Sequence, residues 1–184
     1  HCGFERALSA DDEAELLAIP RKARAEVRKG LKAGLDVRVG RSADDLRGHY
    51  AVYSQSVRNL GTPVFPAKLF RAMLEAFPAE SDILTVLKDG APISSVLSFY
   101  HDGAVMPFWG GGTFAARGAR SNELMYYQLM LHARARGMQR FDFGRSKTDS
   151  GPYKFKKNWG FEPQPLAYAE WTAPGQTPRD VNPN

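Results

Sequence analysis

The chain has 184 residues, of which 43% are hydrophobic and 24% charged, so it is long enough for one well-cored domain and short for two. No apolar run approaches the roughly 20 residues that a transmembrane helix needs. The single cysteine, Cys2, excludes an internal disulfide framework, and the four histidines are scattered without metal-ligand spacing. We therefore expect no metal site and a reducing, cytoplasmic location.

The net charge of +5 is concentrated in one segment, Pro20 to Gly34. A local positive field of this kind favours an anionic partner. Four basic residues share one face of the expected helix, namely Arg21, Arg24, Arg28 and Lys32. They are candidates for contact with tRNA phosphates. The alternative is a solvated face, because the helix lacks interleaved aromatic residues for base stacking.

Residues 1–34 are predicted to form a helical segment. The pattern is helical from about Ala10 to Ala33, with Pro20 breaking the run or starting a second helix. Gly34 is expected to end it. Because the chain opens on His1 without a methionine, we expect this segment to be a remnant of, or a linker from, a preceding domain.

The middle of the chain predicts a sheet packed on helices. A strand at 35–39 is followed by a helix that begins near Ser42 and another that runs from Pro66 to about Phe77. Three strands follow at 83–88, 93–101 and 104–109. The Asp-Gly pairs at 89–90 and 102–103 are strong hairpin signals, so we expect an antiparallel meander.

The last third adds a long helix. Ser121 or Asn122 is expected to cap a helix from Glu123 to Arg136 that is apolar around most of its circumference. A strand at 140–143, a short helix around 153–158 and a final strand at 166–171 follow. Residues 173–184 read as a flexible tail. The predicted fold class is α/β (α+β), with a mostly antiparallel sheet flanked by helices in a domain over residues 35–172.

The residues with most chemical character follow the strand at 140–143. Lys156 is the candidate for stabilising the negative charge that develops in acyl transfer, and Asp142 for acting as a general base or for orienting Tyr153. Arg145, Tyr153 and Lys154 would shape an anionic pocket. The alternatives are a solvated helix face for the lysines and an ion pair with Arg145 or Arg140 for Asp142.

Two glycine-containing motifs are excluded as nucleotide sites. Asp142-Phe143-Gly144 has no kinase Gly-rich loop, strand lysine or His-Arg-Asp motif around it. Gly110-Gly111-Gly112 lacks the Lys and Ser/Thr of a P-loop. It predicts instead a bulge or a close backbone approach beside Trp109. Trp109 and Asn122, whose backbone amide could receive an anion, join the candidate substrate-binding residues.

The order of elements resembles the GNAT acyltransferase fold, and the chain is similar more narrowly to the FemAB-like family. The resemblance rests on the basic run 24–35, on Asn122, on 135–137 leading into 141–144, and on 151–161 with its Phe155-Lys156 pair and Trp159-Gly160-Phe161. It looks closest to the FemAB-related proteins of the PEP-CTERM and exosortase system.

The resemblance implies transfer of an acyl or aminoacyl group to an amine of a cell-envelope precursor, such as peptidoglycan, or of an exopolysaccharide precursor. The donor would be aminoacyl-tRNA or acyl-CoA, with no cofactor required. In the family, a Phe-Lys pair lies by the site of peptidyl transfer, which implies such a place for Phe155 and Lys156. FemAB-type enzymes resemble two GNAT-like domains in tandem, and this chain matches the second. A lipid-linked substrate would imply peripheral association with a membrane.

Two alternatives stay open. The first is an acyl-CoA-dependent GNAT N-acetyltransferase, although Arg117-Gly118-Ala119-Arg120 offers the basic and small residues of an acetyl-CoA loop at the wrong spacing. The second is a non-catalytic GNAT-like module that binds a precursor or a partner in exopolysaccharide assembly.

Overall fold

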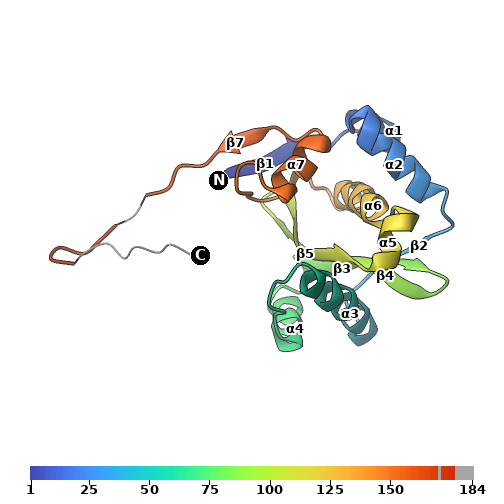
Figure 1. The fold of residues 1–184 in the computed structure, drawn as a ribbon, viewed down its shortest axis with the longest axis horizontal. Helices are drawn as coiled ribbons and strands as arrows, with labels where there is room; N and C mark the ends of the chain where they lie inside the picture. Colours follow the sequence, from blue (N-terminus) through green and yellow to red (C-terminus); the bar gives the residue numbers. More distant parts are fainter. Residues whose placement is uncertain (170, 177–184) are drawn as a thin grey trace.

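The computed structural model describes residues 1–169 and 171–176, which form a seven-stranded sheet with helices on both faces (Figure 1). The elements in chain order are β1 (Cys2–Ala7), α1 (Asp12–Ala18), α2 (Arg21–Leu31), β2 (Asp36–Gly40), α3 (Ala43–Asn59), α4 (Ala67–Ala76), β3 (Ser81–Lys88), β4 (Ala91–His101), β5 (Ala104–Gly112), α5 (Phe114–Ala119), α6 (Ser121–Ala135), β6 (Arg140–Asp142), α7 (Gly151–Asn158) and β7 (Pro163–Pro165). No described helix is both long and apolar enough to cross a membrane.

The strands lie in the order β2-β3-β4-β5-β6-β1-β7, and all neighbours are antiparallel except β5 and β6. The meander β3-β4-β5 turns at Asp89-Gly90, with φ of 52° and 77°, and at Asp102-Gly103, with φ of 47° and 71°. Positive φ at both central residues is what a type I′ hairpin requires. The predicted meander and fold class are therefore confirmed.

Helices cover the two faces of the sheet with separate hydrophobic clusters. Figure 1 shows α3 and α4 on one face of β3–β5 and α6 on the other, with α1 and α2 outside α6. Phe70 and Leu97 lie in the first cluster, and Met125, Phe141 and Trp159 in the second. Burial of these apolar surfaces from water is the main force that holds the layers together.

The N-terminal segment begins with a strand that the sequence analysis did not predict. β1 lies inside the sheet, where Glu5 pairs with Asp142 and Phe4 pairs with Pro163. Phe4 is fully buried in the same cluster as α6, and so are Ile19 and Val27 of the expected helices. The expectation of a purely helical first segment is therefore wrong, and this packing does not favour a linker that stands apart from the sheet.

The last strand is shorter than expected and begins earlier. β7 comprises 163–165, and the strand predicted at 166–171 is absent from the described residues there. β7 pairs only with the first residues of β1, so the chain beyond Pro165 has no strand to bond. Trp171 is accordingly 82% exposed. Of the predicted tail, residues 177–184 lie outside the described part of the chain.

The central helix α6 begins two residues before the predicted position. The predicted caps, Ser121 and Asn122, lie inside it, because the unexpected α5 runs into α6 through Arg120 alone. Arg120 has φ of 56°, a left-handed conformation that turns the chain sharply between the two helices. Both predicted capping side chains are thereby free for other contacts.

The buried carboxylate of Asp82 fixes the other end of α6. It accepts hydrogen bonds from the Tyr100 hydroxyl at 2.7 Å and from the Arg136 guanidinium at 2.8 Å, and it lies 2.8 Å from His132 Nε2. Burying a carboxylate is costly unless such partners satisfy it. The polar side of α6 thus anchors the helix to β3 and β4.

The buried His49 lies in α3, with Nδ1 3.0 Å from Ser95 Oγ and its ring stacked on Tyr53. Burial disfavours the charged imidazolium and lowers the pKa of His49 from 6.5 to about 4. The folded state therefore binds fewer protons than the unfolded state between these two values.

We predict that acid destabilises the fold through His49. The contribution of neutral His49 to the free energy of unfolding is fully present above pH 6.5. It decreases as the pH drops toward 4, by about 3 kcal/mol for one site with this shift. Urea unfolding between pH 4 and 7.5 would measure the slope, and His49→Asn should remove this part of it. An identical pH slope in wild type and variant would contradict the prediction.

Candidate active site

β5 and β6 separate soon after they begin. Their parallel pairing comprises only Ala104 with Arg140 and Val105 with Phe141, while β5 continues along β4 as far as Gly112. The rest of β5 has no strand on that side within the described residues. A cavity of about 300 Å³ lies beside the end of β5, covered by α6 and α7.

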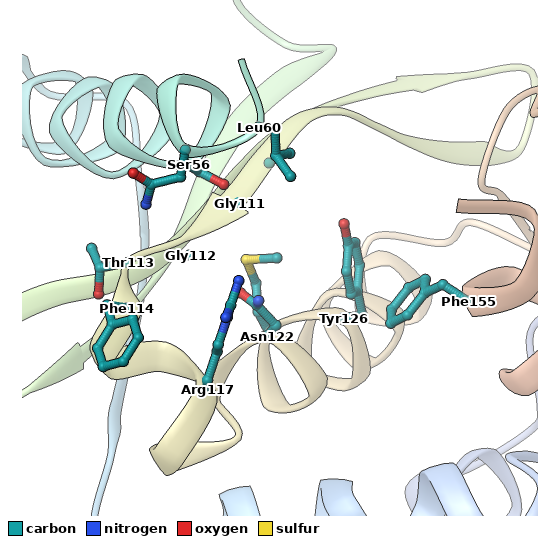
Figure 2. A pocket seen from close by; sticks show the side chains of 13 residues that line it. Ser56, Leu60, Gly111, Gly112, Thr113, Phe114, Arg117, Asn122, Tyr126 and Phe155 are labelled. Carbon is teal, nitrogen blue, oxygen red and sulfur yellow. The ribbon is translucent and has the colours of Figure 1, made fainter. Parts of the chain in front are cut away.

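Five elements line this cavity (Figure 2). Helix α3 contributes Ser56 and Asn59, followed by Leu60, and β5 contributes Gly110, Gly111 and Gly112. Thr113 precedes α5, which contributes Phe114 and Arg117, while α6 contributes Asn122, Met125 and Tyr126, and α7 contributes Phe155. They include one guanidinium and no carboxylate or imidazole. The lining therefore favours neutral or anionic groups.

The three glycines let helices approach β5 closely on both faces. A Cβ on Gly111 would collide with the Ser56 side chain of α3. A Cβ on Gly112 would lie 2.5 Å from Asn122 Oδ1 and 2.7 Å from Ala116 Cβ. The close backbone approach that the sequence predicts at this motif is confirmed, and it brings Asn122 to the wall of the cavity.

Asn122 is held by a buried chain of hydroxyl groups. The Ser94 hydroxyl on β4 donates to Asn122 Oδ1 at 2.8 Å, and Ser94 Oγ lies 2.5 Å from Ser121 Oγ. Because Ser94 uses its single proton on Asn122, the Ser121 hydroxyl acts as the donor to Ser94. The amide oxygen is thus occupied, which leaves the NH₂ group of Asn122 as the free donor.

Tyr126 presents a hydroxyl group to the cavity. Its ring packs edge-on against Phe143 at 5.0 Å and lies 5.7 Å from the ring of Phe155. Figure 2 shows the hydroxyl directed into the open space beside Phe155. Burial raises the pKa of Tyr126 to about 12, so the group is protonated at neutral pH and acts as a hydrogen-bond donor.

Arg117 and Thr113 add polar groups on the side of α5. The guanidinium of Arg117 lies 6.0 Å from the Phe114 ring, and Figure 2 shows it extending toward Asn122. Thr113 Oγ1 is buried without a hydrogen-bond partner among the described residues. A carbonyl or anionic group in this part of the cavity would satisfy both.

Lys156 does not line the cavity, contrary to the expectation that it faces an anionic pocket. Its ammonium group is buried and donates to the carbonyl oxygens of Phe143, Gly144 and Arg145 at 2.6, 3.1 and 3.2 Å. Burial lowers the pKa of Lys156, and the carboxylate of Asp142 opposes that shift. All three ammonium protons are therefore used to hold the loop that follows β6.

The other predicted cations also lie outside the cavity. Arg145 and Lys154 are exposed, and Arg145 is 3.5 Å from the Tyr168 hydroxyl. Asp142 accepts a hydrogen bond from the Gly144 backbone at 2.7 Å and is not paired with Tyr153, whose ring packs on Phe4. The charges after β6 therefore do not converge on this site.

Trp109 lies on the opposite face of the sheet from α6. Its ring contacts Phe70 of α4 at 5.2 Å, and it lines a separate apolar groove with Phe99 and Phe108. The sequence placed it correctly beside the glycines, but strand alternation turns its side chain to the other face. Of the predicted substrate-binding residues, the structure brings Asn122 and Phe155 together in the cavity.

The basic face of α2 remains a surface feature. Arg21, Arg28 and Lys32 are exposed, whereas Arg24 donates to the Leu17 carbonyl at 2.9 Å. Contact of this face with nucleic acid stays a prediction. Among the described residues, no group of three or more His, Cys, Asp or Glu side chains is placed to hold a metal ion.

Tyr126, Arg117 and Ser94 were not found from the sequence. Tyr126 lies in the helix that was expected to be apolar around most of its circumference, and Arg117 was considered only as part of an acetyl-CoA loop at the wrong spacing. Ser94 carries no local signal except that three serines interrupt an otherwise apolar strand. A buried polar residue needs a partner, so this interruption was a sign that could have pointed to the site.

Comparison with known proteins agrees with this fold. Residues 20–157 match the acetyltransferase (GNAT) domain family. The fold is similar to that of FemX, with a TM-score of 0.82 at 16% identity over 88% of this chain. It is also similar to the C-terminal domain of a putative lysylphosphatidylglycerol synthetase from Agrobacterium fabrum, with a TM-score of 0.65 at 14% identity over 88% of this chain. No curated protein matches the chain.

The matched region covers 59% of the FemX chain and 58% of the synthetase domain, so this chain spans less than two thirds of either structure. At these identities the likeness shows the fold alone. The family match extends over most of the chain and includes every residue that lines the cavity. The chain therefore belongs to the GNAT acetyltransferase domain family.

Proposed function

We propose that the chain transfers an acyl or aminoacyl group to an amine, in the manner of FemAB-type enzymes, and that the reaction takes place in the cavity beside the end of β5. The acceptor would be the amine of a cell-envelope or exopolysaccharide precursor. The observation that carries this proposal is the cavity itself, where the Asn122 amide and the Tyr126 hydroxyl act as donors and no carboxylate competes with them.

Acyl transfer requires groups that stabilise negative charge on the carbonyl oxygen. The amine nitrogen bonds to the carbonyl carbon, and the bond from that carbon to the donor's oxygen or sulfur then breaks. Asn122, held by Ser94, offers the NH₂ donor for the oxygen of the tetrahedral intermediate. The Tyr126 hydroxyl, which is protonated at neutral pH, is suited to donate a hydrogen bond to the leaving group as negative charge develops on it.

The cavity lining offers no side chain suited to act as general base near neutral pH. The attacking amine must therefore enter in its neutral form, and the proton that its nitrogen releases as the amide forms goes to solvent or restores the Tyr126 hydroxyl. Asp142 stays a candidate base, but it is bound to the loop backbone in this structure. Arg117 is suited to hold an anionic part of either substrate.

Lys156 supports the site through the loop that it binds. The carbonyls of 143–145 follow β6, and Phe155 and Phe143 both pack on Tyr126. The FemAB resemblance implies a place for Lys156 at the transfer centre. The hydrogen bonds favour a positioning role, in which the ammonium group keeps the aromatic wall of the cavity in place.

Two other functions have observations in their favour. Membership of the GNAT acetyltransferase domain family favours acyl-CoA as the donor. The absence of a carboxylate or imidazole from the cavity lining favours a module that binds a precursor without catalysis. The FemX-like and synthetase-like fold supports the aminoacyl alternative, which we prefer, and the link to PEP-CTERM systems stays a prediction from the sequence.

The donor can be decided by direct assay. The chain is incubated with acetyl-CoA or with a mixture of aminoacyl-tRNAs, and with muropeptides and hexosamines as amine acceptors, and the products are identified by mass spectrometry. We expect aminoacylated acceptor and no acetylated acceptor. Acetylation would support the acyl-CoA alternative. Acceptor binding in calorimetry without either product would support the binding module.

The role of Asn122 and Ser94 is tested by a double-mutant cycle with the donor that the assay identifies. Asn122→Ala should lower kcat by about 100-fold, as expected for loss of one oxyanion donor. Ser94→Ala should lower kcat by roughly tenfold with little change in KM, and should have no further effect in the Asn122→Ala background.

Ser98→Ala is the matched control, because Ser98 is a buried serine of the same strand whose hydroxyl has no partner among the described residues. Its activity should remain at the wild-type level. Additive losses from Ser94→Ala and Asn122→Ala would contradict the positioning role of Ser94.

Lys156→Met keeps the length of the side chain and removes its three hydrogen bonds. We expect the free energy of unfolding in urea to fall by about 2 kcal/mol, because the buried carbonyls lose a charged donor. Lys154→Met, two residues earlier in α7 and exposed, should leave the free energy of unfolding unchanged. Loss of turnover at unchanged stability in Lys156→Met would instead indicate a direct catalytic role.

A further inference from the structure

A second cavity, of about 580 Å³, lies between α3 and α4, the two helices that Figure 1 shows on the face of the sheet opposite α6. This volume is within the range of small-molecule sites. The first half of α3 lines this cavity and its last residues line the candidate active site, and the two cavities share no lining residue. The second cavity is therefore a separate site.

Buried side chains from both helices give the second cavity an apolar part. Leu46 of α3 and Leu74 of α4 line it and are 9% and 5% exposed. Tyr50 is half-buried beside them, and its ring packs edge-on against Phe70 at 5.8 Å. The Tyr50 hydroxyl donates to the Phe65 carbonyl at 3.2 Å, so its proton is already used. This part of the cavity suits an apolar ring or a short chain.

Arginine side chains dominate the charged part of the same lining. Arg41, Arg47 and Arg71 all contribute to it, and the one carboxylate among the lining residues is that of Glu75. Arg47 pairs with Asp44. Neither Arg41 nor Arg71 forms an ion pair with a described residue. The cavity therefore carries an excess of positive charge.

The guanidinium of Arg41 is held in a fixed position at the end of α4. Its two terminal nitrogens donate to the carbonyl oxygens of Leu74 and Pro78. A guanidinium has five N–H groups, so donors remain for a ligand, and carbonyl partners leave its charge without a counterion. A fixed, planar set of donors of this kind is suited to the oxygen atoms of a carboxylate or a phosphate.

We propose that the cavity between α3 and α4 binds a small organic oxyanion, either a carboxylate or a phosphate ester, whose apolar part lies against Leu46 and Leu74. Arg41 and Arg71 bind the oxyanion. The inference goes beyond the proposed function, because it concerns a different cavity and needs no reaction. The arginines repel a cationic ligand, and a neutral ligand gains no charge-assisted hydrogen bond from them.

The test is an NMR titration of the isotope-labelled chain with four compounds of similar size, namely benzoate, phenyl phosphate, benzyl alcohol and benzylamine. At least one of the two anions should bind about tenfold more tightly than benzyl alcohol, as expected for a charge-assisted hydrogen bond. Benzylamine should not bind. The backbone amides of residues 41–50 and 67–78 should shift on binding, and the affinities of the two anions decide between carboxylate and phosphate. High salt should weaken the binding.

Two substitutions at exposed positions of α4 should change the affinity in opposite directions. Arg71→Gln should weaken binding of the anion by roughly tenfold, because one charged donor is lost. Glu75→Gln should strengthen it by roughly twofold, because the one negative charge of the lining is removed. Arg58→Gln is the matched control, since Arg58 is an exposed arginine of α3 that does not line the cavity, and its affinity should equal that of wild type.

The proposal is overturned if neither anion binds, or if both bind no better than benzyl alcohol. An equal loss in Arg58→Gln would also overturn it, because attraction to the surface charge alone would then explain the binding. So would a loss in Arg117→Gln with none in Arg71→Gln, since the anion would then lie in the candidate active site. The assay for acyl transfer uses none of these variants, so failure of either proposal leaves the other standing.

Discussion

The early separation of β5 from β6 is the constraint on which the candidate site depends. Parallel strands that stay paired leave no room between them, whereas here only two residue pairs join β5 to β6, and the rest of β5 has no other described strand on that side. The long helix α6 fills the space beneath, and α7 closes it from the other half of the sheet. The opening therefore follows from the topology, and the side chains only give it chemical character.

That chemical character comes from neutral donors held in place by buried contacts. Ser121 and Ser94 set the direction of the Asn122 amide, and packed aromatic rings set that of Tyr126. Preorganised donors of this kind stabilise developing charge without rearranging when the reaction occurs. The ammonium group of Lys156 acts on the cavity indirectly, because it binds the loop that supports the aromatic wall.

The sequence correctly predicted the features that are set by residues close to one another in the chain. The Asp-Gly turns fixed the meander, and the glycine triplet indicated a close approach. β1 was missed because its six residues include only Cys2 and Phe4 as buried apolar positions, and its partners are more than 130 residues away. Lys156 was placed in a pocket because of its charge and of the FemAB-like resemblance, without regard to the helix face on which it lies. Its spacing of three from Trp159 puts both on one face of α7, and that face is buried.

The position of β1 has a consequence for how the chain acquires its structure. The strand formed by residues 2–7 lies between β6 and β7, so this part of the sheet is incomplete until residues 163–165 have been synthesised. Contacts so distant in sequence form slowly, because a long loop must close before they are gained. During synthesis, residues 2–7 must therefore wait, unpaired and with Phe4 unburied, until β6 and β7 have been made. Completion of this part of the sheet therefore follows the synthesis of β7.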